Sequence, residues 1–265
     1  MLCVQAKRFM KFSRKRRLLT VSSLLIFAVT LILNLASQIY SPKKVFDAFS
    51  GDPPKSTEAL KQALSSPMTA FDLVMANNLV HESLHHTGTR KILFLENWLL
   101  WLGGKIYDPI SRTQDPIRIA NGGTAICSES AAVLNQVALI NGLDARQVGI
   151  DGHVLSEVKV GEKWRLADPH YGFVLPVGYF ELSDMDDDSM RAILMSAFTD
   201  RGVPEETENY FDLFATRDNN WRKEIGEPES PRLALLENFA NHLVWLISVF
   251  FGFTGILSLY WKSQP

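Results

Sequence analysis

Three residues of this chain have the side chains that nucleophilic acyl transfer requires. Cys127 supplies a thiol, His153 an imidazole and Asp168 a carboxylate, in that order along the chain. In such a set the thiolate attacks a carbonyl carbon, the imidazole moves the proton and the carboxylate orients the imidazole. These three are therefore the candidate catalytic residues.

The segment around Cys127 predicts a nucleophile at the start of a helix. A glycine pair, Gly122-Gly123, precedes a helix expected over about 125–141, and Thr124 is expected to cap its start. Cys127 then lies in the first turn, where unpaired N–H groups and the positive end of the helix dipole favour a thiolate. The glycines would leave room for a substrate carbonyl, and the N–H of Cys127 could donate to the developing oxyanion.

A predicted β-hairpin brings His153 close to Asp168. A two-residue turn at Gly161-Glu162 places His153 opposite His170, with Asp168 as its diagonal neighbour on the same face. Diagonal neighbours are roughly 7–8 Å apart, so their side chains can meet, whereas a slip of one residue would put them on opposite faces. His170 could compete as the base, although a neighbouring or exposed role is the simpler interpretation.

Other polar clusters have simpler explanations than chemistry. His81 and His85 share a helical face beside His86, but no glutamate or further ligand accompanies them as in a zinc motif. The acidic run at 184–188 lacks the spacing of a calcium-binding loop and is expected to be a solvated face. Glu129 is explained by a favourable position near the helix dipole. We therefore predict no metal and no cofactor.

The surrounding elements predict an α+β domain. Residues 58–102 are expected to be mainly helical, residues 107–121 to form a long loop, and residues 184–235 to be acidic and partly helical. Short strands are expected at 146–150, 153–160, 163–167 and 173–177. A helical region followed by a small antiparallel sheet is typical of the α+β class.

Charge is distributed unevenly along the 265 residues, whose net charge is -2. Residues 1–17 hold seven Lys/Arg and no acid, whereas residues 18–261 hold 19 Lys/Arg against 29 Asp/Glu, a net charge of -10. The main part of the chain is therefore acidic, which is not the pattern of a basic nucleic-acid-binding protein.

Two uncharged apolar runs predict membrane-spanning helices at 18–39 and 241–261. About 20 apolar residues cross the core of a bilayer, and Trp245, Tyr260 and Trp261 are of the aromatic types that favour its interface. A cleaved signal peptide is the alternative for the first run, and a buried core helix for the second.

The basic residues 1–17 predict the topology. The positive-inside rule places them in the cytoplasm, and two spans return residues 262–265 to the same side. Residues 40–57 are then a linker and residues 58–235 an extracytoplasmic, periplasmic domain. The two spans, which contact the lipid bilayer, anchor this domain at the inner membrane. Cys3 and Cys127 would lie on opposite sides and could not form a disulfide, which leaves a lone external thiol.

Residues 115–178, about a quarter of the chain, resemble the transglutaminase-like core of the papain-type cysteine fold. The resemblance rests on a glycine before a helix-start cysteine, a Gly-hydrophobic-x-Ala-Arg segment, a histidine, and a tryptophan followed by Asp-Pro. These are Gly123, Cys127, Gly142 to Arg146, His153, Trp164 and Asp168-Pro169. Gly123 precedes the cysteine by four positions rather than the two of the family pattern.

The resemblance implies a membrane-anchored, prokaryotic-type member of this superfamily. It implies Cys127 as nucleophile, His153 as general base and acid, Asp168 as the residue that orients His153, and Trp164 as a structural neighbour. Such an enzyme would transfer or hydrolyse acyl groups of amide bonds in envelope peptides or proteins, with water and an amine both open as acceptors. The alternative is a catalytically inactive scaffold or binding protein at the membrane, and the residues define no oligomeric state.

Overall fold

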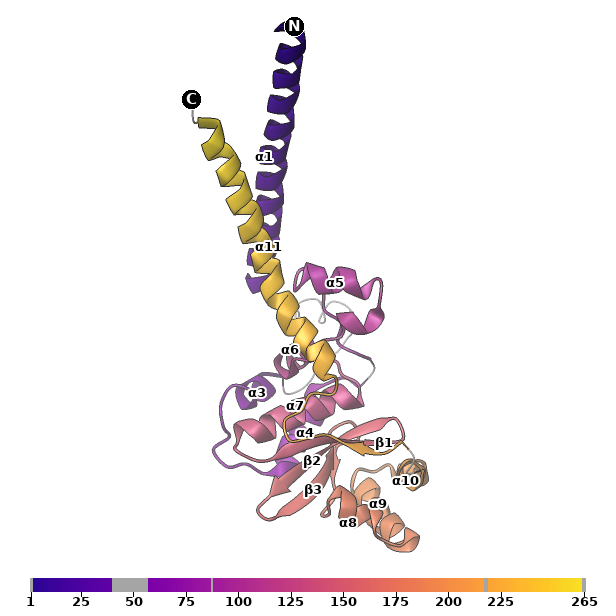
Figure 1. Cartoon of the computed structure of the whole chain (residues 1–265). Coiled ribbons are helices and arrows are strands. Elements are labelled where there is room, and N and C mark those ends of the chain that lie inside the picture. Colours follow the sequence, from indigo (N-terminus) through magenta and orange to yellow (C-terminus); the bar gives the residue numbers. More distant parts are fainter. Residues whose placement is uncertain (1, 40–56, 87, 217–218, 264–265) are drawn as a thin grey trace. The chain divides into compact units, whose positions relative to one another are not determined.

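A computed structural model describes residues 2–39, 57–86, 88–216 and 219–263 (Figure 1). Residues 40–56 of the expected linker lie outside these described residues. The chain divides into two compact units, which are described separately. The first contains residues 1–40, 92–111 and 235–265, and the second contains residues 41–91 and 112–234.

The second unit is built on a five-stranded antiparallel sheet in the order β4-β3-β2-β1-β5. The strands are β1 (Ala145–Ile150), β2 (His153–Val160), β3 (Lys163–Asp168), β4 (Phe173–Val174) and β5 (Trp221–Arg222). Val160 pairs with Lys163, which confirms the predicted turn and its register. β5 was not predicted, and it pairs beside Gly149, where any side chain would collide with the ring of Trp221.

Helix α7 (Cys127–Ile140) covers one face of this sheet. Its Ala131, Leu134 and Ala138 are fully buried, and the small alanines allow close packing. The Ser156 hydroxyl of β2 donates to the carbonyl of Ala131 at 3.1 Å. Helix α7 is therefore joined to the sheet by apolar contact and by hydrogen bonds from the strands.

The start of α7 differs from the prediction in its cap. Ile126 occupies the N-cap position, and the Glu129 carboxylate accepts the Ile126 N–H at 3.3 Å. Thr124 is not the cap, because its hydroxyl donates instead to the carbonyls of His85 and Gly88. Cys127 is nevertheless the first residue of the helix.

Three helices cover the opposite face of the sheet: α8 (Tyr179–Ser183), α9 (Asp187–Asp200) and α10 (Thr207–Ala215). The alternation of strand side chains explains the two layers, since Leu166 packs toward this side and the adjacent Ala167 toward the α7 side. Phe198 of α9 and Tyr210 of α10 are among its fully buried side chains. The unit is thus an α+β domain, as predicted.

Short helices complete the α7 side of the second unit: α3 (Thr57–Ala63), α4 (Leu73–Ser83) and α6 (Pro116–Gly122). Part of the expected loop at 107–121 is therefore helical. Asp115 caps α6 by accepting the Ile117 N–H at 2.9 Å, and Pro116 occupies the first turn, where its missing N–H costs nothing. A polar, proline-containing segment can thus form a capped helix as well as a loop.

The first unit pairs two long apolar helices, α1 (Leu2–Ile39) and α11 (Pro231–Ser263). Both are long and apolar enough to cross a membrane. They run antiparallel, because Asn34 donates to the Val244 carbonyl at 2.9 Å whereas Leu24 packs on Gly255. Small residues and a buried amide at such a contact are typical of helix pairs in membranes.

Two shorter elements also belong to the first unit: α5 (Trp98–Gly104) and the 3-10 helix η1 (Asp108–Ser111). Asn97 caps α5 by accepting the N–H groups of Leu99 and Leu100 at 3.1 and 3.0 Å. This unit therefore combines the two ends of the chain with an internal segment.

Candidate active site

The second unit brings Cys127, His153 and Asp168 together from three different elements. Cys127 begins α7, His153 begins β2 and Asp168 ends β3. His153 Nε2 donates to Asp168 Oδ2 at 2.6 Å, and Cys127 lies close enough to the same ring to help raise its pKa. Since Nε2 is directed to the carboxylate, the other ring nitrogen, Nδ1, is the one available to the thiol.

Asp168 is fully buried and is surrounded by hydrogen-bond donors. Its Oδ1 accepts the backbone N–H groups of His170 and Tyr171 at 2.8 and 3.0 Å, and its Oδ2 accepts the Tyr210 hydroxyl at 2.6 Å as well as His153. Burial opposes the charge, but the attraction of His153 and these hydrogen bonds outweigh it and lower the pKa of Asp168. The carboxylate is therefore held ionised inside the protein.

His153 is held in its protonated form. Burial alone would lower its pKa, but the charge of Asp168, the hydrogen bond to it and the interaction with Cys127 raise the pKa to about 10. The site therefore places a cationic ring next to Cys127 at the start of α7.

Tyr210 is a site residue that the sequence analysis missed. It lies on α10, 42 residues after Asp168, and is fully buried. Burial first, and then the Asp168 charge, raise its pKa well above the usual value for tyrosine, so it remains a donor. No motif or spacing in the chain connects it to Asp168, because only the packing of α10 on the sheet brings them together.

His85 contributes to the site through its backbone. Its N–H donates to the Gly123 carbonyl at 2.8 Å, and its carbonyl accepts the Ala125 N–H at 3.0 Å. These bonds fix the segment that leads into Cys127. His85 is therefore placed to position the nucleophile through its backbone.

The other predicted histidines form a ring stack next to His153. His81 stacks on His86 with centroids 5.1 Å apart, His86 meets His170 at 4.7 Å, and His170 meets His153 at 5.7 Å. Burial lowers the pKa of His86 to about 4 and also lowers that of His170. These two rings are therefore neutral near pH 7, and within the described residues no group of His, Cys, Asp and Glu could hold a metal.

His170 has a different role from the competing base considered above. Its backbone N–H, rather than its ring, contacts Asp168. Among the histidine rings, it is His153 that donates from Nε2 to a carboxylate oxygen of Asp168, Oδ2. The geometry therefore favours His153 as the base.

One expectation about the surroundings of the site is wrong, and the contacts of Trp164 can also be described. Gly122 and Gly123 are buried, and a side chain at Gly122 would collide with Arg90, so this space is filled by the protein rather than left for a substrate. Trp164 lies four residues before Asp168 on β3, about 13 Å away along an extended strand. It stacks with Arg146, whose guanidinium is 3.9 Å from the ring centre.

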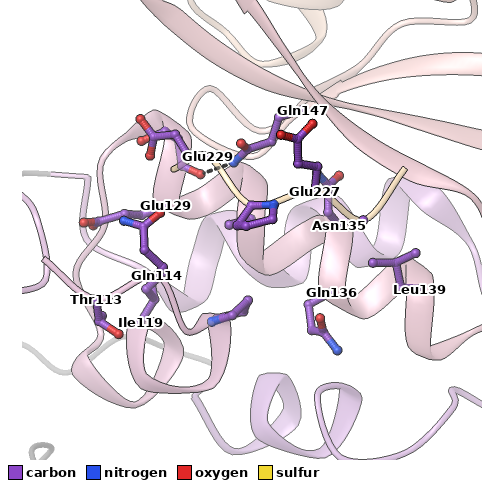
Figure 2. A pocket seen from close by; sticks show the side chains of 15 residues that line it. Thr113, Gln114, Ile119, Glu129, Asn135, Gln136, Leu139, Gln147, Glu227 and Glu229 are labelled. Atoms are coloured by element: carbon purple, nitrogen blue, oxygen red, sulfur yellow. Dashed lines mark hydrogen bonds between the residues drawn. The ribbon is translucent and has the colours of Figure 1, made fainter. Parts of the chain in front are cut away.

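A cavity of about 130 Å³ lies along α7, and Cys127 is not among its lining residues (Figure 2). Ser128, Glu129 and Asn135 of α7, Gln147 of β1 and the segment 226–229 are part of its wall. Three nearly fully buried residues of this wall, Ser128, Asn135 and Gln147, each have a side-chain oxygen that has no hydrogen-bond partner within the described part of the chain. A cavity of this size with such polar groups in its wall can hold ordered water.

Glu129 is the buried carboxylate of this cavity. Its Oε2 accepts the backbone N–H groups of Arg90 and Ile126 at 3.0 and 3.3 Å. Burial, with a smaller contribution from the charge of Glu229, nevertheless raises its pKa to about 7. Two backbone hydrogen bonds therefore do not offset the loss of hydration.

Comparisons with protein-family models, with curated proteins and with solved structures gave no significant match for this chain. Any assignment of function therefore depends on the residues and the geometry described above.

Proposed function

We propose that this protein is a membrane-anchored, transglutaminase-like cysteine enzyme that transfers or hydrolyses acyl groups of amide bonds. The observation that carries the proposal is the arrangement in which Cys127 adjoins His153 and His153 is hydrogen-bonded to a fully buried Asp168. A nucleophile, a base in contact with it and a third group that orients the base are the elements of covalent acyl transfer.

The first half of the reaction forms a thioester. The Cys127 thiolate attacks the amide carbonyl carbon, and the electron pair of the C=O bond moves to oxygen. The N–H of Cys127 at the start of α7 is placed to donate to that oxyanion. When the C–N bond breaks, the His153 imidazolium gives its proton to the leaving nitrogen, so a free amine leaves and an acyl-enzyme remains.

The second half returns the enzyme to its starting state. Neutral His153 accepts a proton from the incoming water or amine as that molecule attacks the thioester carbonyl. The C–S bond then breaks, the thiolate is released and His153 is again protonated. Asp168 keeps Nε2 as the donor to its Oδ2 throughout, which leaves Nδ1 to face the reacting atoms.

The proposed location follows from the two apolar helices and the basic residues 1–17. With the basic end in the cytoplasm, the second unit faces the periplasm, and its substrates are peptides or proteins of the cell envelope.

Thiol alkylation tests the proposal without a known substrate. The full chain with Cys3→Ser, purified in detergent, is treated with iodoacetamide at pH 6, where an ordinary thiol with a pKa of about 8.5 is almost fully protonated. We expect rapid labelling that slows about 10- to 100-fold in His153→Ala and disappears in Cys127→Ser. An equal rate in the parent and in His153→Ala would instead indicate an inactive scaffold.

Acceptor choice needs a second assay. The same protein is incubated with a labelled primary amine and a labelled glutamine-containing peptide. Incorporation of the amine indicates transfer, and peptide cleavage or deamidation indicates hydrolysis. Absence of all these products over a broad peptide set, despite an activated thiol, would contradict an amide-directed enzyme.

A further inference from the structure

Residues 92–111 of the first unit have an apolar surface that the first unit does not cover. More than half of their side chains are aliphatic or aromatic. The strongly exposed ones are Phe94, Leu95, Leu102, Ile106 and Tyr107, with Ile106 88 % exposed. Several exposed apolar side chains in one short segment make it a candidate interaction site.

This segment is fixed to α11 at one level of that helix. Asn97 Nδ2 donates to Asn241 Oδ1 at 2.9 Å, and Ile92 and Leu100 pack with Ala240 in one buried cluster. Ala240 and Asn241 lie directly before the uncharged apolar run that begins at Leu243. The segment is therefore level with the end of a candidate membrane span.

The side chains of the segment have the chemistry of a bilayer interface. Trp98, Trp101 and Tyr107 are amphipathic aromatics, which favour the depth of the lipid headgroups. Phe94 packs edge-on against Trp101 with centroids 5.2 Å apart, and Lys105 Nζ lies 4.7 Å from the Trp101 ring centre. The ammonium of Lys105 therefore makes a cation–π contact with an interface aromatic.

The segment is too short and too polar to cross the bilayer itself. Helix α5 has 7 residues and is about 10 Å long, against a hydrocarbon core of about 30 Å. Glu96 and Asp108 flank it with charges that would remain at the surface. The segment can therefore lie along the membrane surface but cannot span it.

We propose that residues 92–111 form a membrane-interface segment that inserts Leu102, Ile106 and Tyr107 among the headgroups and upper acyl chains of the bilayer. The proposal rests on the proposed membrane anchoring by α1 and α11, and it adds a third, surface-lying contact with lipid. The occupant is lipid rather than protein because the segment is attached to α11 just before its apolar run, and α1 and α11 of the same unit also expose apolar side chains.

Depth-dependent fluorescence quenching tests the proposal on the full chain. Single cysteines are introduced as Ile106→Cys, Phe250→Cys or Glu162→Cys in a Cys3→Ser, Cys127→Ser background and labelled with an environment-sensitive nitrobenzoxadiazole probe. Each protein is reconstituted into nanodiscs of phosphatidylcholine and phosphatidylglycerol that carry a nitroxide either at the headgroup or deep in the acyl chain. Phe250 is 61 % exposed within the apolar part of α11, and the Glu162 side chain is 96 % exposed in the β2–β3 turn.

We expect the Ile106 probe to lose most of its fluorescence with the headgroup nitroxide, the Phe250 probe with the deep nitroxide, and the Glu162 probe with neither. If Phe250 is quenched but Ile106 behaves like Glu162, the interface segment is overturned while the anchor stands. Lack of quenching at Phe250 would overturn the membrane anchoring itself. Cross-linking of Ile106→Cys between copies, without lipid quenching, would show that a second copy covers this face and would also overturn the proposal.

Discussion

Two buried carboxylates near the nucleophile have opposite electrostatic environments. Asp168, which is hydrogen-bonded to His153, has a lowered pKa. Glu129, in the first turn of α7, has its pKa raised to about 7. Both accept two backbone N–H groups. Burial and backbone hydrogen bonds are therefore common to both and cannot explain the difference.

The difference comes from the additional groups that each carboxylate meets. Asp168 also binds the cationic His153 ring and the Tyr210 hydroxyl, whereas Glu129 has another carboxylate, Glu229, nearby. An opposite charge at contact distance favours the ionised form, and a like charge disfavours it. Two carboxylates with separated pKa values are a feature of sites that handle protons.

The largest expected effect comes from removing the charge of Asp168. Asp168→Asn keeps an oxygen for the backbone donors but cannot stabilise the His153 imidazolium, so we expect iodoacetamide labelling of Cys127 at pH 6 to slow about tenfold or more. The exposed Asp200→Asn on α9 makes the same change as a control. An unchanged rate, with the melting temperature preserved, would contradict the role of Asp168 in activating the cysteine.

Removing the Tyr210 hydroxyl should have a smaller effect on labelling. Tyr210→Phe leaves the His153–Asp168 bond in place but removes one donor to a buried charge, a loss of about 1.5–3 kcal/mol of stability. Urea unfolding would measure that loss, and labelling should slow by less than in Asp168→Asn. Tyr179→Phe on α8 is the matched control, and equal losses in the two variants would show that the bond from the Tyr210 hydroxyl to Asp168 adds no stability.

Glu129→Gln should raise the stability of the protein, whereas Tyr210→Phe should lower it. A carboxyl whose pKa is raised from 4.5 to about 7 on folding stabilises the folded state below pH 4.5, and this contribution is lost as the pH rises through 7. Glutamine removes that loss, so the variant should gain melting temperature over the parent at pH 8 and not at pH 4. Melting temperatures that change with pH in the same way in the two proteins would disprove the raised pKa of Glu129.

The smallest effect is expected from Glu229→Gln on the exposed side of the same cavity. Removing this like charge should lower the pKa of Glu129. Glu129 would then be more fully ionised at neutral pH, and the loss of stability would occur at a lower pH. The measurement is the midpoint of the melting-temperature change between pH 4 and pH 8, which should shift downward. In a protein that already carries Glu129→Gln, adding Glu229→Gln should leave the dependence of melting temperature on pH unchanged.

Local patterns predicted the elements that carry the site. Short strands and a two-residue turn defined the β2–β3 register, because the turn fixes which residues pair and a slip of one residue would move every side chain to the other face. The helix start at Cys127 was also predictable, although Ile126 rather than Thr124 is the cap. The helical part of 107–121 and the short strand β5 were missed, since each depends on one cap or on one neighbouring strand.

The sequence by itself determined the α+β class, the hairpin register, the helix-start cysteine and the apolar runs near both ends, because these depend on periodicity and on residues close together in the chain. Only the tertiary structure decided which donors surround Asp168, why Glu129 differs from it, and that residues 92–111 belong with the long helices. The physical reason is that pKa values and unit boundaries depend on distances between groups far apart in sequence. Tyr210, 42 residues from Asp168, has a role that only folding creates.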